Sequence, residues 1–304
     1  MKKGSAKRLI SLGACTVDVI LKVPDVPVFD AKVIAEDGTV VGQGMAVTAA
    51  CSAAALGGDV AVWGRIGSDR IGDFFLADLA DAGVDTSQIR RAEGARTGVA
   101  AVICDAAGQR LNVPFYDPAL GSDSSWLPVD QLDHVDCVLA DTRWPEGSRR
   151  ILAEAKARNL IRILDGDVAS RDTIASLVPL ASHAIFSEPG FKIFSGADDV
   201  LPTLLEEGSV CQGIIGVTLG ERGFAWVEKD RVRTVPSPKV DVVDTLAAGD
   251  VFHGAFALAT AEGRSVEEAG KFACAAAAVK CSRFGGRRGI PTREEVQTLV
   301  EDFY

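Results

Sequence analysis

The sequence has no long apolar run. Its 304 residues begin Met-Lys-Lys, but no apolar stretch long enough for a signal peptide follows, and no segment approaches the length of a membrane span. Seven cysteines, an odd number, lie far apart and mostly within apolar segments. This spacing is typical of reduced core residues and excludes a disulfide framework. Together these absences predict a cytoplasmic protein.

Concentrated basic charge is also lacking. The chain has 32 Lys and Arg against 42 Asp and Glu, and its most basic segment, residues 283–288, holds three arginines beside glycines. This balance excludes a general nucleic-acid binder. The sequence has neither the Gly-x-x-x-x-Gly-Lys-Ser/Thr loop of P-loop proteins nor a histidine pair or carboxylate cluster for a structural metal. Phosphoryl transfer by other machinery stays open.

What the sequence does contain is a rhythm of short apolar segments and glycine turns. Apolar residues make up 47% of the chain and aromatic residues only 6%. From residue 136 onward, buried strands alternate with helices. We expect strands at residues 137–140, 160–164, 184–186 and 213–219, and helices at 147–158, 249–261, 266–282 and 292–303. Because parallel strands need crossover connections, this order predicts a mostly parallel sheet flanked by helices.

Two segments have a different pattern. Residues 17–41 and 97–115 contain short β-branched runs that alternate with polar residues, including 19–23, 32–35 and 98–103, which is typical of strands with one exposed face. We expect these two segments to form a small β-sheet lid over the carboxyl ends of the main sheet. The α/β core that binds nucleotide and substrate would then comprise residues 1–16, 42–96 and 116–304.

The segment most informative about chemistry is residues 240–255. An extended run enters a turn of small residues, Ala247, Ala248 and Gly249, and a helix is expected to follow at the acidic residue Asp250. Backbone N–H groups of such a turn, together with the helix dipole, form a hole for an anion such as a phosphoryl group in transfer. An aspartate beside that hole can accept the proton of an attacking hydroxyl. The plain alternative is that Asp250 only caps a helix.

The segment Asp244–Asp250 resembles the C-terminal signature Asp-Thr-x-(Gly/Ala)-Ala-Gly-Asp of the ribokinase family of carbohydrate kinases, also called the PfkB family. The resemblance implies a ribokinase-like three-layer α/β sandwich with a mostly parallel central sheet and a small β-sheet lid. It also implies ATP and Mg2+ as cofactors, Asp250 as the catalytic base, and an anion hole at Ala247, Ala248 and Gly249. Asp244 is a candidate ligand of a monovalent cation, K+.

Further segments resemble the same family in order along the chain: residues 13–18, 42–50, 64–72 and 217–223. Simple close packing and ordinary turns are the alternatives for each segment taken alone. The resemblance assigns the following candidate positions. Substrate would contact Asp18, Lys32, Gly42, Gln43, Gly44, Thr48 and Arg143, and the nucleotide would contact Ser187, Thr218, Gly220 and Gly223.

The chain departs from the family pattern at three positions. Thr48 stands where members commonly have an asparagine that contacts the sugar. Ser187 and Gly190 replace both named residues of an Asn-x-x-Glu motif tied to magnesium and phosphate. Glu188 is then the acidic candidate left nearby for the metal.

Within the family, residues 138–144, 164–167, 186–190 and 281–291 most resemble sulfofructose kinases. In that interpretation Arg143 and Lys32 hold an anionic end of a ketose such as sulfofructose, a task that suits the planar fork of arginine. Solvated surface charge is the alternative for both residues. Pro114 stands where a sulfosugar enzyme would be expected to have an asparagine.

The function predicted from the sequence is ATP-dependent phosphorylation of a hydroxyl of a small sugar or sugar derivative. Two alternatives stay open. One is a nucleoside kinase of the same fold, with Phe115 or Tyr116 stacking on the base; the other is a catalytically silent sugar-binding regulatory protein. Exposed edges of the lid strands favour a homodimer formed through the lid.

Overall fold

The computed structural model describes residues 6–27, 30, 32–105, 109–210 and 212–304. The strands are β1 (Arg8–Gly13), β2 (Thr16–Lys22), β3 (Asp37–Gln43), β4 (Asp59–Gly67), β5 (Val84–Ala92), β6 (Gly98–Cys104), β7 (Arg110–Phe115), β8 (Cys137–Ala140), β9 (Ile161–Gly166), β10 (His183–Ser187), β11 (Ile214–Thr218), β12 (Phe224–Glu228) and β13 (Arg231–Val235). The helices are α1 (Met45–Ala55), α2 (Arg70–Leu79), α3 (Pro145–Ala157), α4 (Arg171–Leu177), α5 (Glu188–Ser195), α6 (Val200–Val210), α7 (Ala248–Ala261), α8 (Val266–Cys281) and α9 (Arg293–Phe303).

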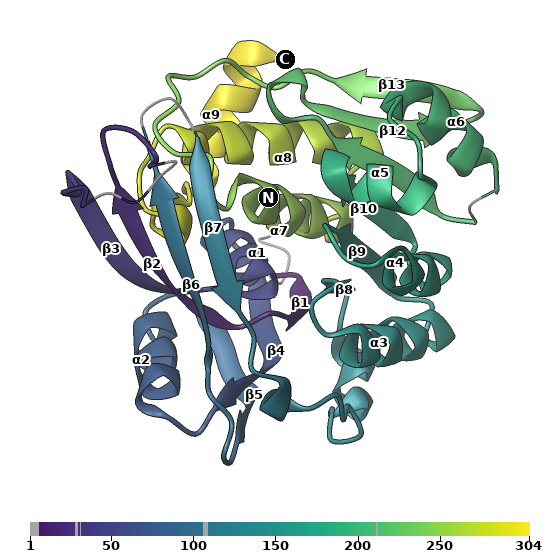
Figure 1. The fold of residues 1–304 in the computed structure, drawn as a ribbon. Helices are drawn as coiled ribbons and strands as arrows, with labels where there is room; N and C mark the ends of the chain where they lie inside the picture. Colours follow the sequence, from purple (N-terminus) through teal and green to yellow (C-terminus); the bar gives the residue numbers. More distant parts are fainter. Residues whose placement is uncertain (1–5, 28–29, 31, 106–108, 211) are drawn as a thin grey trace.

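The large sheet has nine strands in the part of the chain that the structure describes, in the order β13-β12-β11-β10-β9-β8-β1-β4-β5. The seven strands from β11 to β5 run parallel, and β12 and β13 add an antiparallel hairpin at one edge. Helices cover both faces of this sheet (Figure 1). The predicted mostly parallel α/β sheet is confirmed.

Side chains of the central strands alternate between two hydrophobic cores, because successive residues of a strand point to opposite faces. Leu9 and Leu139 belong to the core beneath α1, α7 and α8, whereas their neighbours Ile10 and Val138 belong to the core beneath α3 to α6. Burial on both faces explains why these strands are continuous apolar runs in the sequence.

A second sheet, which we call the lid sheet, has the order β3-β2-β6-β7 among the described residues. The strands β2 and β6 are parallel, and the other two pairings are antiparallel. The lid sheet stands beside the carboxyl ends of β1 and β8 to β11 (Figure 1). It is therefore a mixed sheet built from two segments that are far apart in the chain.

The prediction of a strand at residues 32–35 is wrong. Residues 32–36 are irregular, and β3 begins at Asp37. Pairing of β2 with β3 ends at Lys22 opposite Asp37, so residues before Asp37 have no facing strand. An apolar, β-branched run without a neighbouring backbone has nothing to bond to and does not form a strand.

Close approach of α1 and α7 depends on a glycine. A Cβ built on Gly254 of α7 would lie 2.1 Å from the carbonyl oxygen of Ala49 in α1. These two helices begin at the same edge of the large sheet, and their N-termini both lie beside the lid sheet (Figure 1). The close contact therefore helps to fix the positions of both N-termini.

None of the described helices has the length and apolar character that a membrane crossing requires.

The substitution Gly254→Ala should destabilise the fold, although the same change in an ordinary helix is stabilising. We expect the free energy of unfolding to fall by about 1 to 3 kcal/mol, because the new methyl group overlaps the Ala49 carbonyl oxygen. Urea unfolding of both proteins measures this difference. The control Thr260→Ala, at a half-buried position of the same helix, should change stability by less than about 1 kcal/mol. A stabilised Gly254→Ala variant would contradict the packing argument.

Candidate active site

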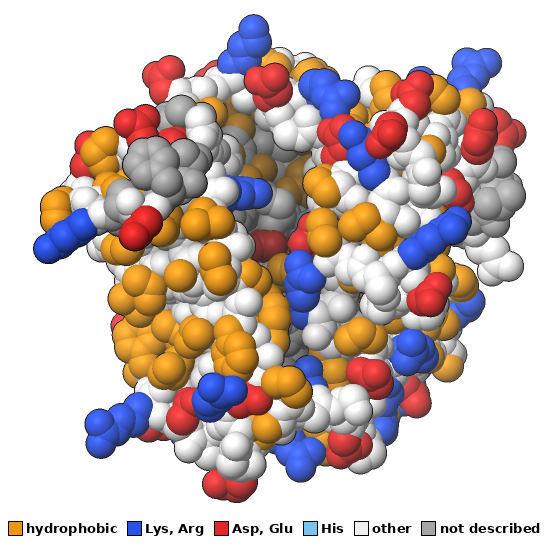
Figure 2. Space-filling model, in the orientation of Figure 1, with side chains coloured by type: hydrophobic (Ala, Val, Ile, Leu, Met, Phe, Trp, Pro, Cys, Tyr) orange, Lys and Arg blue, Asp and Glu red, His pale blue; other side chains and the backbone are white. Residues whose placement is uncertain are grey.

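Two cavities meet at the carboxyl edge of the large sheet. The first, of about 240 Å3, lies between this edge and the lid sheet, and we call it the lid cavity. The second, of about 1050 Å3, lies between the loop after β11, the segment 236–242 and helices α7 and α8, and we call it the C-terminal cavity. Figure 2 shows a hollow beside the lid sheet with acidic side chains on its floor. The residues that line both cavities are Arg110, Thr218, Thr245, Ala248 and Gly249.

The turn of small residues lies at the junction of the two cavities. Ala247 has a left-handed backbone (φ 65°), which non-glycine residues rarely adopt, and α7 begins at Ala248. The first N–H groups of a helix have no partner within the helix, and here the residues that carry them line the lid cavity. The Ala248 N–H makes a 3.3 Å bond to the Thr245 carbonyl oxygen. This turn can hold an anion.

Asp250 is the third residue of α7 and lines the lid cavity. The helix begins two residues before the acidic residue, and no side chain caps its N-terminus, so Asp250 is not the helix cap. Burial in the closed cleft raises the pKa of Asp250 well above its usual range, and the charges of Asp165, Asp167, Asp141 and Asp18 raise it further. A carboxylate with a raised pKa is a stronger base than an ordinary one.

Asp18 of β2 faces the same cavity from the lid sheet. The side chain is 5% exposed, accepts a 2.7 Å bond from the Thr16 hydroxyl, and accepts a 2.8 Å bond from Nε2 of Gln43. Burial raises the pKa of Asp18 to about 6, although both hydrogen bonds lower it. The Gln43 Oε1 is held in turn by the Arg287 N–H at 3.0 Å. The carboxylate is thus fixed by two residues of the lid sheet, and one of these, Gln43, is held in turn by Arg287 from outside it.

Three further aspartates lie at or just past the carboxyl ends of β8 and β9. Asp141 is fully buried and accepts N–H bonds from Ala14 at 2.7 Å, Ala46 at 3.3 Å and Arg143 at 2.8 Å. Burial raises its pKa, and these N–H bonds lower it. The carboxylate therefore ties the end of β8 to the end of β1 and to the first turn of α1.

Asp165 and Asp167 line the lid cavity itself. Burial raises the pKa of Asp165 well above its usual range, and the neighbouring charges of Asp167 and Asp141 add to the effect. Within the described residues, Oδ2 of Asp165 has no hydrogen-bond partner, and Nδ1 of His253 lies 3.4 Å from it. The cavity floor therefore holds more negative charge than the chain neutralises.

His253 connects two elements of this site. Its ring nitrogens lie 2.8 Å from the Gly249 carbonyl oxygen and 3.2 Å from the Ile185 carbonyl oxygen. Burial lowers the pKa of the ring. The side chain joins the first turn of α7 to strand β10.

Residues of β7 also reach the lid cavity, and two of them, Arg110 and Asn112, were not expected from the sequence. Arg110, Asn112 and Pro114 of β7 line the cavity together with Tyr116 just after the strand, which leaves the odd-numbered residues of β7 on the outer face. The Arg110 Nη1 lies 3.2 Å from the carbonyl oxygen and 3.3 Å from Oγ1 of Thr245. The period of two in this strand is a signal that would have identified these side chains.

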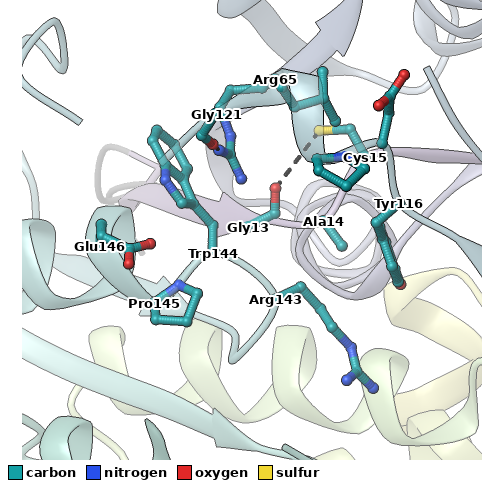
Figure 3. Close-up of a pocket in the computed structure, with 13 residues that line it drawn as sticks. Gly13, Ala14, Cys15, Arg65, Tyr116, Gly121, Arg143, Trp144, Pro145 and Glu146 are labelled. Atoms are coloured by element: carbon teal, nitrogen blue, oxygen red, sulfur yellow. Dashed lines mark hydrogen bonds between the residues drawn. The ribbon is translucent and has the colours of Figure 1, made fainter. Parts of the chain in front are cut away.

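Arg143 lies just past the end of β8 and lines the lid cavity. Its guanidinium bonds Asp167 at 3.0 Å and the Val168 carbonyl oxygen at 2.6 Å, while its buried Nε has no partner in the described part of the chain. A smaller pocket of about 210 Å3 adjoins it, in which the Arg65 guanidinium lies 4.0 Å from the centre of the Trp144 ring. Arg143 and Tyr116 line both this smaller pocket and the lid cavity, and Figure 3 shows the two side chains at one side of the smaller pocket.

The structure brings most of the predicted residues to these cavities. The predicted residues at the lid cavity are Asp18, Gln43, Gly44, Arg143, Ser187, Thr218, Ala247, Ala248, Gly249 and Asp250. Gly220 and Gly223, both with positive φ, line the C-terminal cavity together with Thr218. Ser187 caps α5 and donates a 2.8 Å bond to Asp167.

Five predicted residues line neither cavity: Lys32, Gly42, Thr48, Glu188 and Asp244. Lys32 is exposed, and the Gly42 N–H bonds Asp78 at 2.8 Å. Thr48 is fully buried within α1. Glu188 pairs with Arg222 at 2.5 Å and Lys192 at 3.3 Å.

Asp244, the remaining predicted residue, lies behind the turn and is 3% exposed. Its Oδ1 accepts a 2.8 Å bond from the Leu246 N–H. The carboxylate therefore orders the backbone that leads into the turn.

Comparison with known proteins identifies the family. Residues 6–293 match the model of the pfkB family carbohydrate kinases. The chain is 26% identical to ribokinase of Bacillus subtilis, over 97% of this chain and 99% of the relative. It is 27% identical to fructokinase-1 of Oryza sativa, over 98% of this chain and 99% of that relative.

Solved structures agree with this result. A crystal structure of a protein from Agrobacterium tumefaciens, provisionally called a ribokinase, superposes with a TM-score of 0.95 at 39% identity and covers 98% of this chain and 99% of that one. A ribokinase from Arabidopsis thaliana, solved with ribose and ATP, has a TM-score of 0.83 at 23% identity and covers 97% of this chain and 99% of that one. The predicted ribokinase-like fold is confirmed. The chain belongs to the PfkB family of carbohydrate kinases, which phosphorylate sugars with ATP.

Proposed function

We propose that the protein transfers the γ-phosphoryl group of ATP to a hydroxyl of a small sugar or sugar derivative held in the lid cavity. The observation that carries this proposal is the position of Asp250. It lines the lid cavity at the N-terminus of α7, beside a turn whose residues also line the C-terminal cavity. A base and an anion hole thus lie where the two cavities meet, as in-line transfer between two ligands requires.

Asp250 acts as the general base in this proposal. Its carboxylate accepts the proton of the acceptor hydroxyl, and the hydroxyl oxygen attacks the γ-phosphorus. The bond between that phosphorus and the β,γ-bridging oxygen of ATP breaks, and ADP leaves. The N–H groups at Ala247, Ala248 and Gly249 hold the oxygens of the transferring group, aided by the positive end of α7. Asp18, fixed by Thr16 and Gln43, accepts hydrogen bonds from other hydroxyls of the acceptor.

ATP occupies the C-terminal cavity in this proposal. Gly220 and Gly223 have positive φ and line that cavity, and Thr218 lines both cavities. The phosphates then point at the turn, with Arg110 of the lid beside the transfer point. The cavity of about 1050 Å3 has room for a nucleotide.

Mg2+ fits the site as part of the ATP substrate. Among the described residues, Oδ2 of Asp165 has no hydrogen-bond partner, and both Asp165 and Asp167 line the lid cavity, whereas Glu188 lines neither cavity. The ion supplies positive charge that neutralises the phosphates. Asp165 and Asp167 then orient the hydrated ion through their oxygens, which Mg2+ prefers as ligands.

An anionic group on the acceptor would be held by Arg143. Its Nε is buried without a partner, and its fork lies at the edge of the lid cavity. A sulfonate or phosphate that replaces Asp167 as its partner would gain two parallel hydrogen bonds. Arg110 adds a second cation to the same cavity, so an anionic ketose suits the site.

A nucleoside acceptor is the second candidate, favoured by one observation. Tyr116 lines the lid cavity and offers a ring for stacking, whereas Phe115 lies outside it, with the Arg96 guanidinium 4.5 Å from its ring centre. One aromatic ring supports stacking on a base from one side.

The test is ATP consumption with Mg2+ against neutral sugars, phosphosugars, a sulfosugar and nucleosides. We expect turnover with a sugar acceptor, and a fall in kcat of about 10²- to 10⁴-fold in Asp250→Asn, because the base is lost. Asp230→Asn, in the exposed turn between β12 and β13, is the matched control and should match the unmodified protein. Activity in Asp250→Asn equal to the control would contradict the role of Asp250.

The same panel separates the acceptor classes. An anionic acceptor should have the lowest KM, and Arg143→Met should raise that KM without raising the KM of a neutral analogue. Preference for a nucleoside would replace the sugar proposal. Binding of a sugar without turnover of any acceptor would favour a silent binding protein.

We also propose that the protein forms a homodimer through the outer face of the lid sheet. Paired residues of β3, β2, β6 and β7 form an apolar row across this face, Val40-Val19-Ala101-Val113. Val113 is 56% exposed and Val40 is 45% exposed. Figure 2 shows hydrophobic side chains gathered over the lid strands. A second copy would remove this apolar surface from water.

Substitution of Val113 by Asp tests the dimer. Analytical ultracentrifugation should show a dimer for the unmodified protein and a monomer for Val113→Asp, because a charge would be buried in the interface without a partner. The control Leu201→Asp, at an exposed apolar position of α6, should leave the dimer intact. A dimer that survives Val113→Asp, or a monomeric unmodified protein, would refute this interface.

A further inference from the structure

Lys280 of α8 is a fully buried amine directly behind the anion-binding turn. Its side chain is 0% exposed. Three oxygens surround its Nζ: the Asp244 carbonyl oxygen at 2.7 Å, Oδ2 of Asp244 at 3.1 Å and the Arg283 carbonyl oxygen at 3.5 Å. An ammonium group has three donors and no acceptor, so this set of oxygens fits its charged form.

The residues around Asp244 do not fit an additional monovalent cation. Oδ1 of Asp244 accepts the Leu246 N–H, and Oδ2 accepts N–H bonds from Gly285 at 3.0 Å and Gly286 at 3.1 Å in addition to Lys280. The carbonyl oxygens that would help to bind a K+ ion already accept from Lys280. A second positive charge placed here would be repelled by the ammonium group.

We propose that Lys280 is a built-in cation that takes the place of a bound monovalent ion and positions the turn at residues 247–249. This inference rests on the proposed function of that turn. The ammonium group neutralises Asp244 and holds its carbonyl oxygen, while the carboxylate holds the Leu246 N–H. The backbone entering the turn is thereby held on both sides of residue 245.

The same ion pair also reaches the lid cavity. Asp244 binds the N–H groups of Gly285 and Gly286, and the next N–H, of Arg287, holds Oε1 of Gln43. Gln43 holds Asp18 through its other amide atom. One buried pair thus supports the anion hole and the acceptor carboxylate together. Without the ammonium group, a buried and unpaired carboxylate would remain beside the anion hole.

The first experiment uses the unmodified protein in potassium chloride and in tetramethylammonium chloride at equal ionic strength. We expect the same melting temperature and, with the acceptor identified by the panel, the same kcat in both salts. A melting temperature or a kcat that rises specifically with K+ would overturn the proposal. Melting needs no acceptor, so this result stands even if the proposed kinase activity fails.

The second experiment uses Lys280→Met, with Lys271→Met on the exposed side of the same helix as the matched control. In tetramethylammonium we expect kcat of Lys280→Met to fall roughly tenfold, less than the loss of a whole anion-hole donor, with KM for ATP unchanged. Potassium should raise both the melting temperature and the kcat of this variant alone. Lys280→Met with unaltered kcat, or with a lowered kcat that K+ does not raise, would contradict a cationic role.

If Lys280→Met does not fold, the double variant Asp244→Asn with Lys280→Met removes both charges and keeps the proposal falsifiable. We expect it to fold, to have a lowered kcat, and to show no response to K+, because the anionic partner is gone. A kcat equal to that of the unmodified protein would overturn the positioning role of the pair.

Discussion

Mutual repulsion among carboxylates is the constraint on which this active site depends. Asp18, Asp141, Asp165, Asp167 and Asp250 are gathered where the lid meets the carboxyl edge of the sheet. Burial raises the pKa values of Asp18, Asp141, Asp165 and Asp250, and neighbouring carboxylates raise those of Asp165 and Asp250 further. The fold offsets this charge in a graded way. Asp141 is satisfied by backbone N–H groups, Asp167 by Arg143, and Asp165 only in part by His253. The charge left over is placed where a nucleotide and its Mg2+ would arrive.

A second consequence of this constraint is that the buried ion pair that orders the backbone and the carboxylate that acts as a base lie on opposite sides of the turn. Asp244 and Lys280 neutralise each other behind the turn, so the backbone there is ordered without adding net charge to the cavity. Among the described residues, Asp250, in front of the turn, forms no ion pair with a Lys or Arg, and it stays a basic carboxylate. Only Thr245 and Leu246 separate Asp244 of the structural ion pair from Ala247, whose N–H is the first of the proposed anion hole. This arrangement lets the helix N-terminus act on a ligand instead of on its own side chains.

Local sequence patterns were sufficient for much of the fold. The apolar runs at residues 137–140 and 184–186 predicted buried parallel strands, because both of their faces meet helices. The turn before Asp250 could be recognised because its small residues are contiguous. The prediction of a strand at residues 32–35 was wrong, although the composition of this run suits a strand. A strand needs a partner, and the pairing of β2 with β3 ends at Lys22 opposite Asp37. Arg110 and Lys280 could not be placed from the sequence, because what each does depends on Thr245 or Asp244, far away in the chain.

The most direct test of the account is the pH dependence of kcat/KM in the unmodified protein and in Asp165→Asn, measured well below the KM of both substrates. Asp250 works as a base only when ionised, so activity should fall as the pH drops through its raised pKa, above the usual carboxyl value of about 4. Removing the charge of Asp165 lowers the pKa of Asp250 and should move this acid limb to lower pH. An acid limb that stays in place in Asp165→Asn would contradict the claim that the carboxylate cluster sets the basicity of Asp250.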